Sequence, residues 1–137
     1  MGHSISFVVP GKVIGKGRPH FVRKTGVAIT PQQTRSYEGL IRDIVLPQMV
    51  GKKPWEGCVR ACITGYYKVP KSWSKTKAAA AMSQEIPPKK PDVDNVVKIV
   101  LDALNRVVYL DDTQVTRCFV EKIWADEDRL EVFLEEI

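Results

Sequence analysis

The 137-residue sequence is poor in cysteine and histidine and has no long hydrophobic run, and each shortage excludes a class of protein. Three scattered cysteines are too few for a disulfide scaffold, and they fit a reducing compartment. Two histidines leave no zinc-ligand spacing and little scope for a Ser-His-Asp triad. No stretch approaches the roughly 20 apolar residues of a membrane helix, and no secretory signal opens the chain. We therefore expect one cytoplasmic domain that does not span a membrane.

A basic, glycine-rich segment over residues 11–19 does not match the known phosphate-binding loops. Only three residues separate Gly11 from Gly15-Lys16, and Gly17 stands where a P-loop needs Ser or Thr. The third glycine of a dinucleotide-binding fingerprint is also missing. We interpret the segment as a loop between strands rather than a specific phosphate site, and loose contact with a DNA backbone stays open.

What the sequence does have is a sharp division of charge. Residues 1–91 carry 16 Lys or Arg and four Asp or Glu, a net charge of +12, whereas residues 92–137 carry five and twelve, a net charge of −7. The basic part suits an anionic partner, which could be nucleic acid, an acidic membrane surface or an acidic protein. The acidic part therefore has a different task.

Hydrophobic periodicity and turn residues predict both strands and helices. Thr30-Pro31 is expected to begin the first helix, with Thr30 as its N-cap, and Pro47 to end or kink that helix. The last two strands, which flank the acidic turn 125–128, are predicted to pair as a hairpin. The predicted strands are 5–10, 27–29, 58–69, 115–124 and 129–135, and the predicted helices are 30–47, 78–82 and 95–107.

The most informative stretch is Asp92-Val93-Asp94-Asn95, which follows a segment stiffened by prolines. If the chain stays extended there, Asp92 and Asp94 project to the same side. Two like charges held close repel unless a cation lies between them, and a hard divalent ion such as Mg²⁺ or Mn²⁺ meets that need. The alternative is helix capping, but two aspartates, an asparagine and two preceding lysines exceed what a cap requires.

Lys98 lies four residues after Asp94 and four before Asp102, so a helix would place all three on one face. As a surface ion-pair ladder they would contribute only about 0.3–0.5 kcal/mol per pair. The functional interpretation is an ammonium group beside a metal site, near a nucleophile or a developing negative charge. Position alone leaves both interpretations open.

A second acidic pair, Asp111-Asp112, follows the same helix. Aspartate is common in turns, so the pair by itself is a weak signal. Because the helix is short and the next strand must return, the pair can fold back beside the first and supply a third carboxylate. Mg²⁺ is often held by a few carboxylates, with waters and substrate phosphates completing its shell. Acids with basic flanks fit DNA hydrolysis, in which Lys and Arg bind the backbone and the acids bind metal.

Two gapped motifs resemble the signature of the RusA family of Holliday-junction resolvases, which are small endodeoxyribonucleases often carried by phages and prophages. Between Asp92 and Asn105 the chain reads DVDNVVKIVLDALN, and between Leu110 and Val115 it reads LDDTQV. The GKGRP stretch at residues 15–19 also looks like a segment common in that family.

The resemblance implies an α+β fold, with a single domain over residues 1–137 and a mixed β-sheet packed by helices. Residues 1–4 of that span also resemble vector-derived sequence. It further implies a symmetric homodimer that cleaves four-way junction DNA with Mg²⁺, for which Mn²⁺ could substitute. A four-way junction has approximate two-fold symmetry, and a C2 dimer would supply two matched cuts.

Residue by residue, the resemblance also implies roles at the acidic motifs. Asp92, Asp94 and Asp112 match the family's catalytic, metal-binding acids, and Lys98 matches its catalytic lysine. Asp111 matches an adjacent acid of less defined role.

Phosphate contacts of a salt-sensitive, sequence-independent kind are expected from basic side chains on either side of the acids. The candidates are Lys16, Arg18, Lys71, Lys75, Lys77, Lys89 and Lys90. Three rival functions stay open: a non-catalytic junction-binding relative, a nuclease of the same chemistry acting on flaps or single strands, and an adaptor for an acidic partner.

Overall fold

A computed structural model describes residues 2–137, and Met1, the first residue of the vector-like segment, lies outside them. The strands and helices expected from the sequence are all present, with ends shifted by a few residues, and β2 is an additional strand. In chain order the elements are β1 (Ser4–Pro10), β2 (His20–Val22), β3 (Val27–Ile29), α1 (Gln32–Met49), β4 (Val59–Lys68), α2 (Lys75–Met82), α3 (Val93–Leu104), the 3₁₀ turn η1 (Asp112–Gln114), β5 (Val115–Ala125) and β6 (Arg129–Glu136).

Four strands form one mixed sheet in the order β1-β6-β4-β5. β4 pairs antiparallel with β6 and parallel with β5, and β1 pairs antiparallel with β6. The predicted β5–β6 hairpin is therefore wrong, because β4 lies between the two strands. The acidic turn instead crosses the end of β4, where the Lys68 N–H donates to Asp128 Oδ1 at 2.8 Å and the Val69 N–H donates to the Ala125 carbonyl at 3.2 Å.

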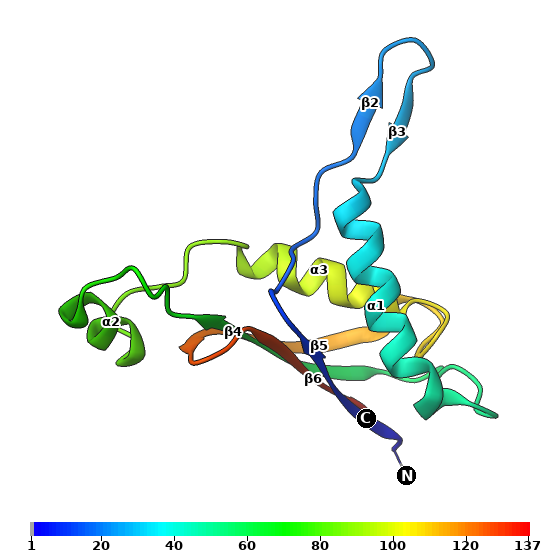
Figure 1. Cartoon of the computed structure of the whole chain (residues 1–137). Helices are drawn as coiled ribbons and strands as arrows, with labels where there is room; N and C mark the ends of the chain where they lie inside the picture. Colours follow the sequence, from blue (N-terminus) through cyan, green and yellow to red (C-terminus); the bar gives the residue numbers. More distant parts are fainter. Residues whose placement is uncertain (1) are drawn as a thin grey trace.

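Helices α1 and α3 lie together over one face of the main sheet (Figure 1). Alternate residues of β1, β4 and β6 are buried toward them, as the period-2 pattern of these strands requires. α3 has a strongly one-sided apolar pattern, and its fully buried residues are Val96, Ile99, Val100, Ala103 and Leu104. The expected α+β class, with a mixed sheet packed by helices, is confirmed.

Both ends of α1 differ from the prediction. The helix begins at Gln32, and Pro31 occupies the N-cap position without a side-chain cap, so Thr30 is not the N-cap. Pro47 lies inside the helix and does not end it, because α1 continues to the buried Met49. Among the helices of residues 2–137, none is long and apolar enough to cross a membrane.

β2 and β3 form a separate two-stranded sheet that extends away from the main sheet, beyond the start of α1 (Figure 1). We call residues 18–30 the arm. Its strands pair antiparallel, with Phe21 opposite Ala28. The tight turn at its end contains Gly26, whose φ of 66° lies in the left-handed region that glycine adopts without strain.

Candidate active site

The two aspartates at the start of α3 have different surroundings. The helix begins at Val93, so Asp92 is the N-cap residue in an extended conformation, whereas Asp94 lies in the first helical turn. Successive helical residues turn by about 100°, which places side chains two positions apart on nearly opposite sides of the axis. The extended chain that would have directed both carboxylates to one side therefore ends at Asp92.

Asp94 lines a cavity of about 410 Å³ beside α3 and β5, which we call the acid cavity. The predicted face of α3 is confirmed, because Lys98 and Asp102 line the same cavity, and Asp112 of η1 joins them. The complete lining is Asp94, Val97, Lys98, Leu101, Asp102, Asp112, Cys118 and Val120. Acids distant in sequence thus meet at one apolar-walled cavity.

Within the acid cavity, the Asp112 carboxyl lies close enough to Asp102 for each acid to affect the charge of the other. Partial burial raises the pKa of Asp112 above its usual value, and the Asp102 side chain and the negative charge of Asp111 raise it further. A hydrogen bond with Asn105 acts in the opposite direction. Two carboxylates held close repel each other, and a shared proton or a nearby cation relieves that repulsion.

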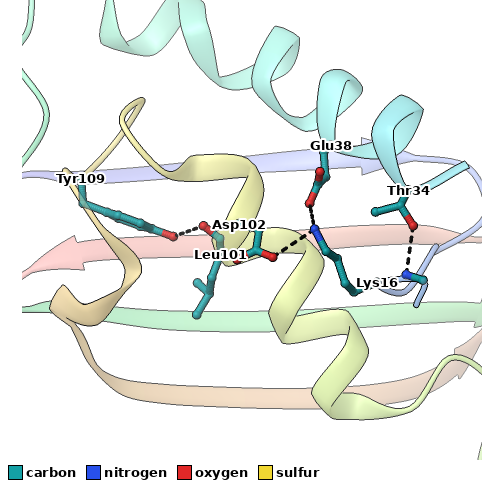
Figure 2. Close-up of polar contacts among 7 residues, drawn as sticks. Lys16, Thr34, Glu38, Leu101, Asp102 and Tyr109 are labelled. Atoms are coloured by element: carbon teal, nitrogen blue, oxygen red, sulfur yellow. Dashed lines mark hydrogen bonds and ion pairs between the residues drawn. The ribbon is translucent and has the colours of Figure 1, made fainter. Parts of the chain in front are cut away.

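Asp102 is also held by Lys16. The Lys16 Nζ lies 3.1 Å from Asp102 Oδ2 and 2.8 Å from Glu38 Oε2 (Figure 2). Burial by itself would lower the pKa of Lys16, but the hydrogen bonds to Glu38 and Asp102 outweigh it and raise that pKa above its usual value. This ion cluster ties the glycine-rich loop to both α1 and α3.

The backbone of the glycine-rich loop is used inside the protein. The Lys16 N–H donates to the Asn95 carbonyl at 2.9 Å, and the Gly17 N–H donates to Thr34 Oγ1 at 2.9 Å. A Cβ on Gly15 would lie 2.5 Å from the Cβ of Pro91, so the close approach to α3 needs glycine. These contacts support a structural loop. DNA contact by Lys16 stays a prediction. The ammonium group that would make this contact is already paired with two carboxylates.

Asp92 lines a second cavity of about 310 Å³, which we call the loop cavity. It occupies the N-cap position of α3 but makes no side-chain capping hydrogen bond. Among residues 2–137, no group of three His, Cys, Asp or Glu side chains is arranged to hold one metal ion. The joint ligation of metal by Asp92, Asp94 and Asp112 stays a prediction. The loop cavity is lined by Lys12, Val13, Ile14, Gly15, Lys16, Gln33, Lys90, Pro91, Asp92 and Asn95.

Asp111 has a structural task at the start of η1. Its carboxylate accepts the Thr113 N–H at 3.0 Å, while the Gln114 side chain accepts the Asp111 N–H at 2.9 Å, which completes a capping box. The bond from Thr113 lowers the pKa of Asp111 below its usual value. This cap holds Asp112 in its place at the acid cavity.

The other predicted phosphate contacts are exposed. Lys90 lines the loop cavity beside Asp92. The Lys77 Nζ lies 4.0 Å from the centroid of the Trp73 ring, a cation–π contact that orders this lysine on α2. The exposed candidates are Arg18, Lys71, Lys75, Lys77, Lys89 and Lys90.

Two residues of the site do not stand out from the sequence. The motif spacing presents Asp102 only as an ion-pair partner of Lys98, and it does not present Glu38 at all. The spacing of Asp102, eight residues after Asp94, did predict that it shares the helical face of the site, but no role at the site was expected from it. Nothing in the sequence marks Glu38 as a partner of Lys16, because the two meet only through tertiary packing.

The protein is of the class of α+β domains suited to act on a phosphodiester. Three features define that class: the mixed sheet, the acid cavity and the exposed basic side chains. The chain belongs to the RusA family, since the family model described as endodeoxyribonuclease RusA matches residues 10–135. The resemblance drawn from the motifs is thereby confirmed, and the protein is an endodeoxyribonuclease, an enzyme that hydrolyses phosphodiester bonds. Family membership also supports a role at Holliday junctions.

A relative in Bacillus subtilis (strain 168), the uncharacterized protein YqaN, is 33% identical over 141 residues. The match covers 97% of this chain and 96% of that protein, so the two share the whole length of the domain.

Proposed function

We propose that this endonuclease is Mg²⁺-dependent and resolves four-way DNA junctions by paired, symmetric cuts in recombination and repair. The observation that carries the proposal is the acid cavity, where Asp94, Lys98 and Asp112 lie together although η1 and the start of α3 are separate in the chain. These are three of the four positions that match the family's catalytic residues. Asp92, the fourth, immediately precedes α3 and lines the loop cavity instead.

The residues of the acid cavity fit a hard divalent cation. Asp94 and Asp112 would hold it, because Mg²⁺ typically takes one or two carboxylates and keeps water and substrate phosphate in its remaining positions. The contact between Asp112 and Asp102 supports this, since a cation relieves the repulsion of two paired acids. When bound, Mg²⁺ or Mn²⁺ would polarise the phosphodiester and promote ionisation of a water molecule. Asp92 matches a metal-binding acid of the family by its motif position, but it lines the loop cavity, so the acid cavity would supply the ion with two of the three matched carboxylates.

Lys98 would act on the substrate rather than on the fold. Its side chain is exposed, lines the acid cavity, and lies one helical turn from both Asp94 and Asp102. An ammonium group there would bind a phosphate oxygen and stabilise the negative charge that develops on it. Asp111, through its cap on η1, would keep Asp112 oriented.

A homodimer completes the proposal. Resolution of a junction into ligatable duplexes needs two cuts related by symmetry, and two copies of one site related by a two-fold axis provide them.

The experiment that tests this function is a panel of labelled four-way junction, flap, duplex and single-stranded DNAs, incubated with Mg²⁺ or with EDTA. We expect paired cuts in the four-way junction with Mg²⁺, none with EDTA, and slower cleavage of the other DNAs. Cleavage in EDTA would reject the metal, and a preference for flaps or single strands would reject the junction. Junction binding without cleavage would support the non-catalytic alternative, and no nucleic-acid affinity at low salt would support the adaptor.

A further inference from the structure

The arm carries apolar surface that the rest of residues 2–137 does not cover. Phe21 exposes 76% of its surface and Val27 exposes 54%. The residue opposite Phe21 is Ala28, which is too small to shield an aromatic ring. Two-stranded hairpins are marginally stable by themselves in water, so a partner that covers Phe21 and Val27 would stabilise the arm.

The charge around Phe21 is of one sign. Arg18, Arg23 and Lys24 are all exposed on the arm, and no acidic residue occurs between Gly17 and Glu38 in the sequence. Among the ion pairs of the described residues, none involves these three cations. Basic side chains interleaved with an exposed aromatic ring match a nucleic acid, whose phosphates bind the cations and whose bases stack on the ring.

The arm is anchored next to the catalytic helix. At its base, the Lys16 N–H donates to the Asn95 carbonyl on α3, and Lys16 reaches Asp102 on the same helix. Arg18 follows two residues later, so the arm leaves the body of the protein close to the helix that carries Asp92 and Asp94. DNA bound at these acids would therefore lie within reach of the arm.

Resting on the proposed function, we propose that the arm grips the junction DNA and that Phe21 inserts at its branch point, where it stacks on a base. Base pairs at the branch point lack a continuous stack on one side, so they open at lower cost than pairs inside a duplex. Apolar side chains inserted between base steps are an established way for proteins to hold distorted DNA. Arg18, Arg23 and Lys24 would then bind the flanking phosphates.

The test uses four-way junctions that carry 2-aminopurine at the branch point, in EDTA so that no cleavage occurs. This base brightens when it is unstacked, and we expect the wild-type protein to raise its fluorescence. Phe21→Ala should abolish that rise and weaken junction binding about tenfold, on the scale of one lost base–aromatic contact. Phe21→Trp should retain the rise. A rise of wild-type size with Phe21→Ala would overturn the insertion of Phe21.

Matched variants test separately the ring and the charges of the arm. Phe119→Ala makes the same chemical change on β5, where Phe119 is 59% exposed. This variant should leave the fluorescence rise unchanged, and a loss equal to that of Phe21→Ala would overturn the assignment to the arm.

The double variant Arg23→Gln with Lys24→Gln tests the charges. It should lower the slope of log affinity against log salt by about two, and an unchanged slope would overturn the phosphate contacts.

Two further readouts distinguish the possible failures. If Phe21→Ala converts a wild-type dimer to a monomer in sedimentation, the arm binds a second copy of the chain, and the DNA proposal is overturned. If the wild-type protein does not bind the junction more tightly than duplex DNA in EDTA, the proposed junction function fails instead. This comparison of affinities is separate from the fluorescence test of Phe21, so the two failures can be distinguished.

Discussion

The two cavities beside α3 differ in how their acids are neutralised. In the loop cavity, Asp92 shares the lining with Lys12, Lys16 and Lys90, so lysines surround the one carboxylate. In the acid cavity, Asp94, Asp102 and Asp112 share the lining with Lys98, and Asp102 also pairs with Lys16. Even with that pair, the acid cavity holds more carboxylates than ammonium groups, whereas lysines outnumber the single carboxylate of the loop cavity. The comparison therefore supports the acid cavity as the proposed metal site, because excess negative charge attracts a divalent cation.

The largest expected effect comes from neutralising, one at a time, the carboxylates of Asp94 and Asp92, which line different cavities beside α3. Asp94→Asn should lower single-turnover junction cleavage by at least about 100-fold, because a group that organises transition-state charge is lost, while junction binding in EDTA is retained. Asp92→Asn should also lower cleavage, but by less. The measurement is cleavage under single-turnover conditions with saturating protein. A greater loss in Asp92→Asn would move the metal to the loop cavity, and wild-type cleavage by Asp94→Asn would reject the site.

An intermediate effect is expected from the lysine that connects the two cavities. Lys16→Met should lower the free energy of unfolding by about 1.5–3 kcal/mol, because Glu38 and Asp102 lose the charged hydrogen bonds that hold them. Denaturation in urea would measure this change. Lys12→Met is the matched control, since Lys12 is exposed in the same loop and makes no ion pair within the described residues, and it should change stability little. Equal effects of the two substitutions would show that the ion cluster does not hold the loop.

The smallest expected effect is a gain of stability in Asp112→Asn. The folded state raises the pKa of Asp112, so this group favours folding below its unfolded value of 3.8, and that contribution is lost as the pH rises through the folded pKa. The neutral asparagine avoids the loss. At pH 7 in EDTA, its free energy of unfolding should exceed that of the wild type by less than about 1 kcal/mol, since water screens a partly exposed group.

Urea denaturation of Asp112→Asn and wild type at pH 7 and at pH 3 would measure this gain. The difference in free energy of unfolding between the two proteins should shrink at pH 3, where Asp112 is as neutral as the asparagine that replaces it. A less stable Asp112→Asn protein at pH 7 would contradict the raised pKa. Such a variant, more stable but deficient in cleavage, would be the mark of a site that keeps repelling charges for function.

Local pattern was sufficient for most elements of this fold, and for one face of the site. The four-residue spacing of the charged residues predicted that Asp94, Lys98 and Asp102 share a face of α3, and all three line the acid cavity. Local pattern was not sufficient to predict how the strands pair. The acidic turn after Ala125 looks like a hairpin turn, yet β4 enters between β5 and β6, because a strand's neighbours depend on which surfaces pack and not on the turn that follows it.

The position of a helix start shows the same limit on a smaller scale. Prolines ahead of Asp92 made an extended chain through Asp94 reasonable, but α3 begins at Val93 and turns the two side chains apart. The helix starts two residues earlier than the predicted residue 95, which places Asp94 in the first helical turn, where it lines the acid cavity. Helix boundaries are the part of a helix that sequence patterns define least well.

By itself the sequence determined the family resemblance, the acids and lysine of the motif, and the order of the strands and helices apart from β2, since these depend on residue identity and short-range spacing. Only the tertiary structure decided that Asp112 meets Asp102, that Lys16 joins Glu38 to Asp102, and that the arm stands clear of the body. Those contacts join residues far apart in the chain, and the packing of α1 and α3 over the sheet brings them together. The periodicity of residues along the chain gives no information about these long-range contacts.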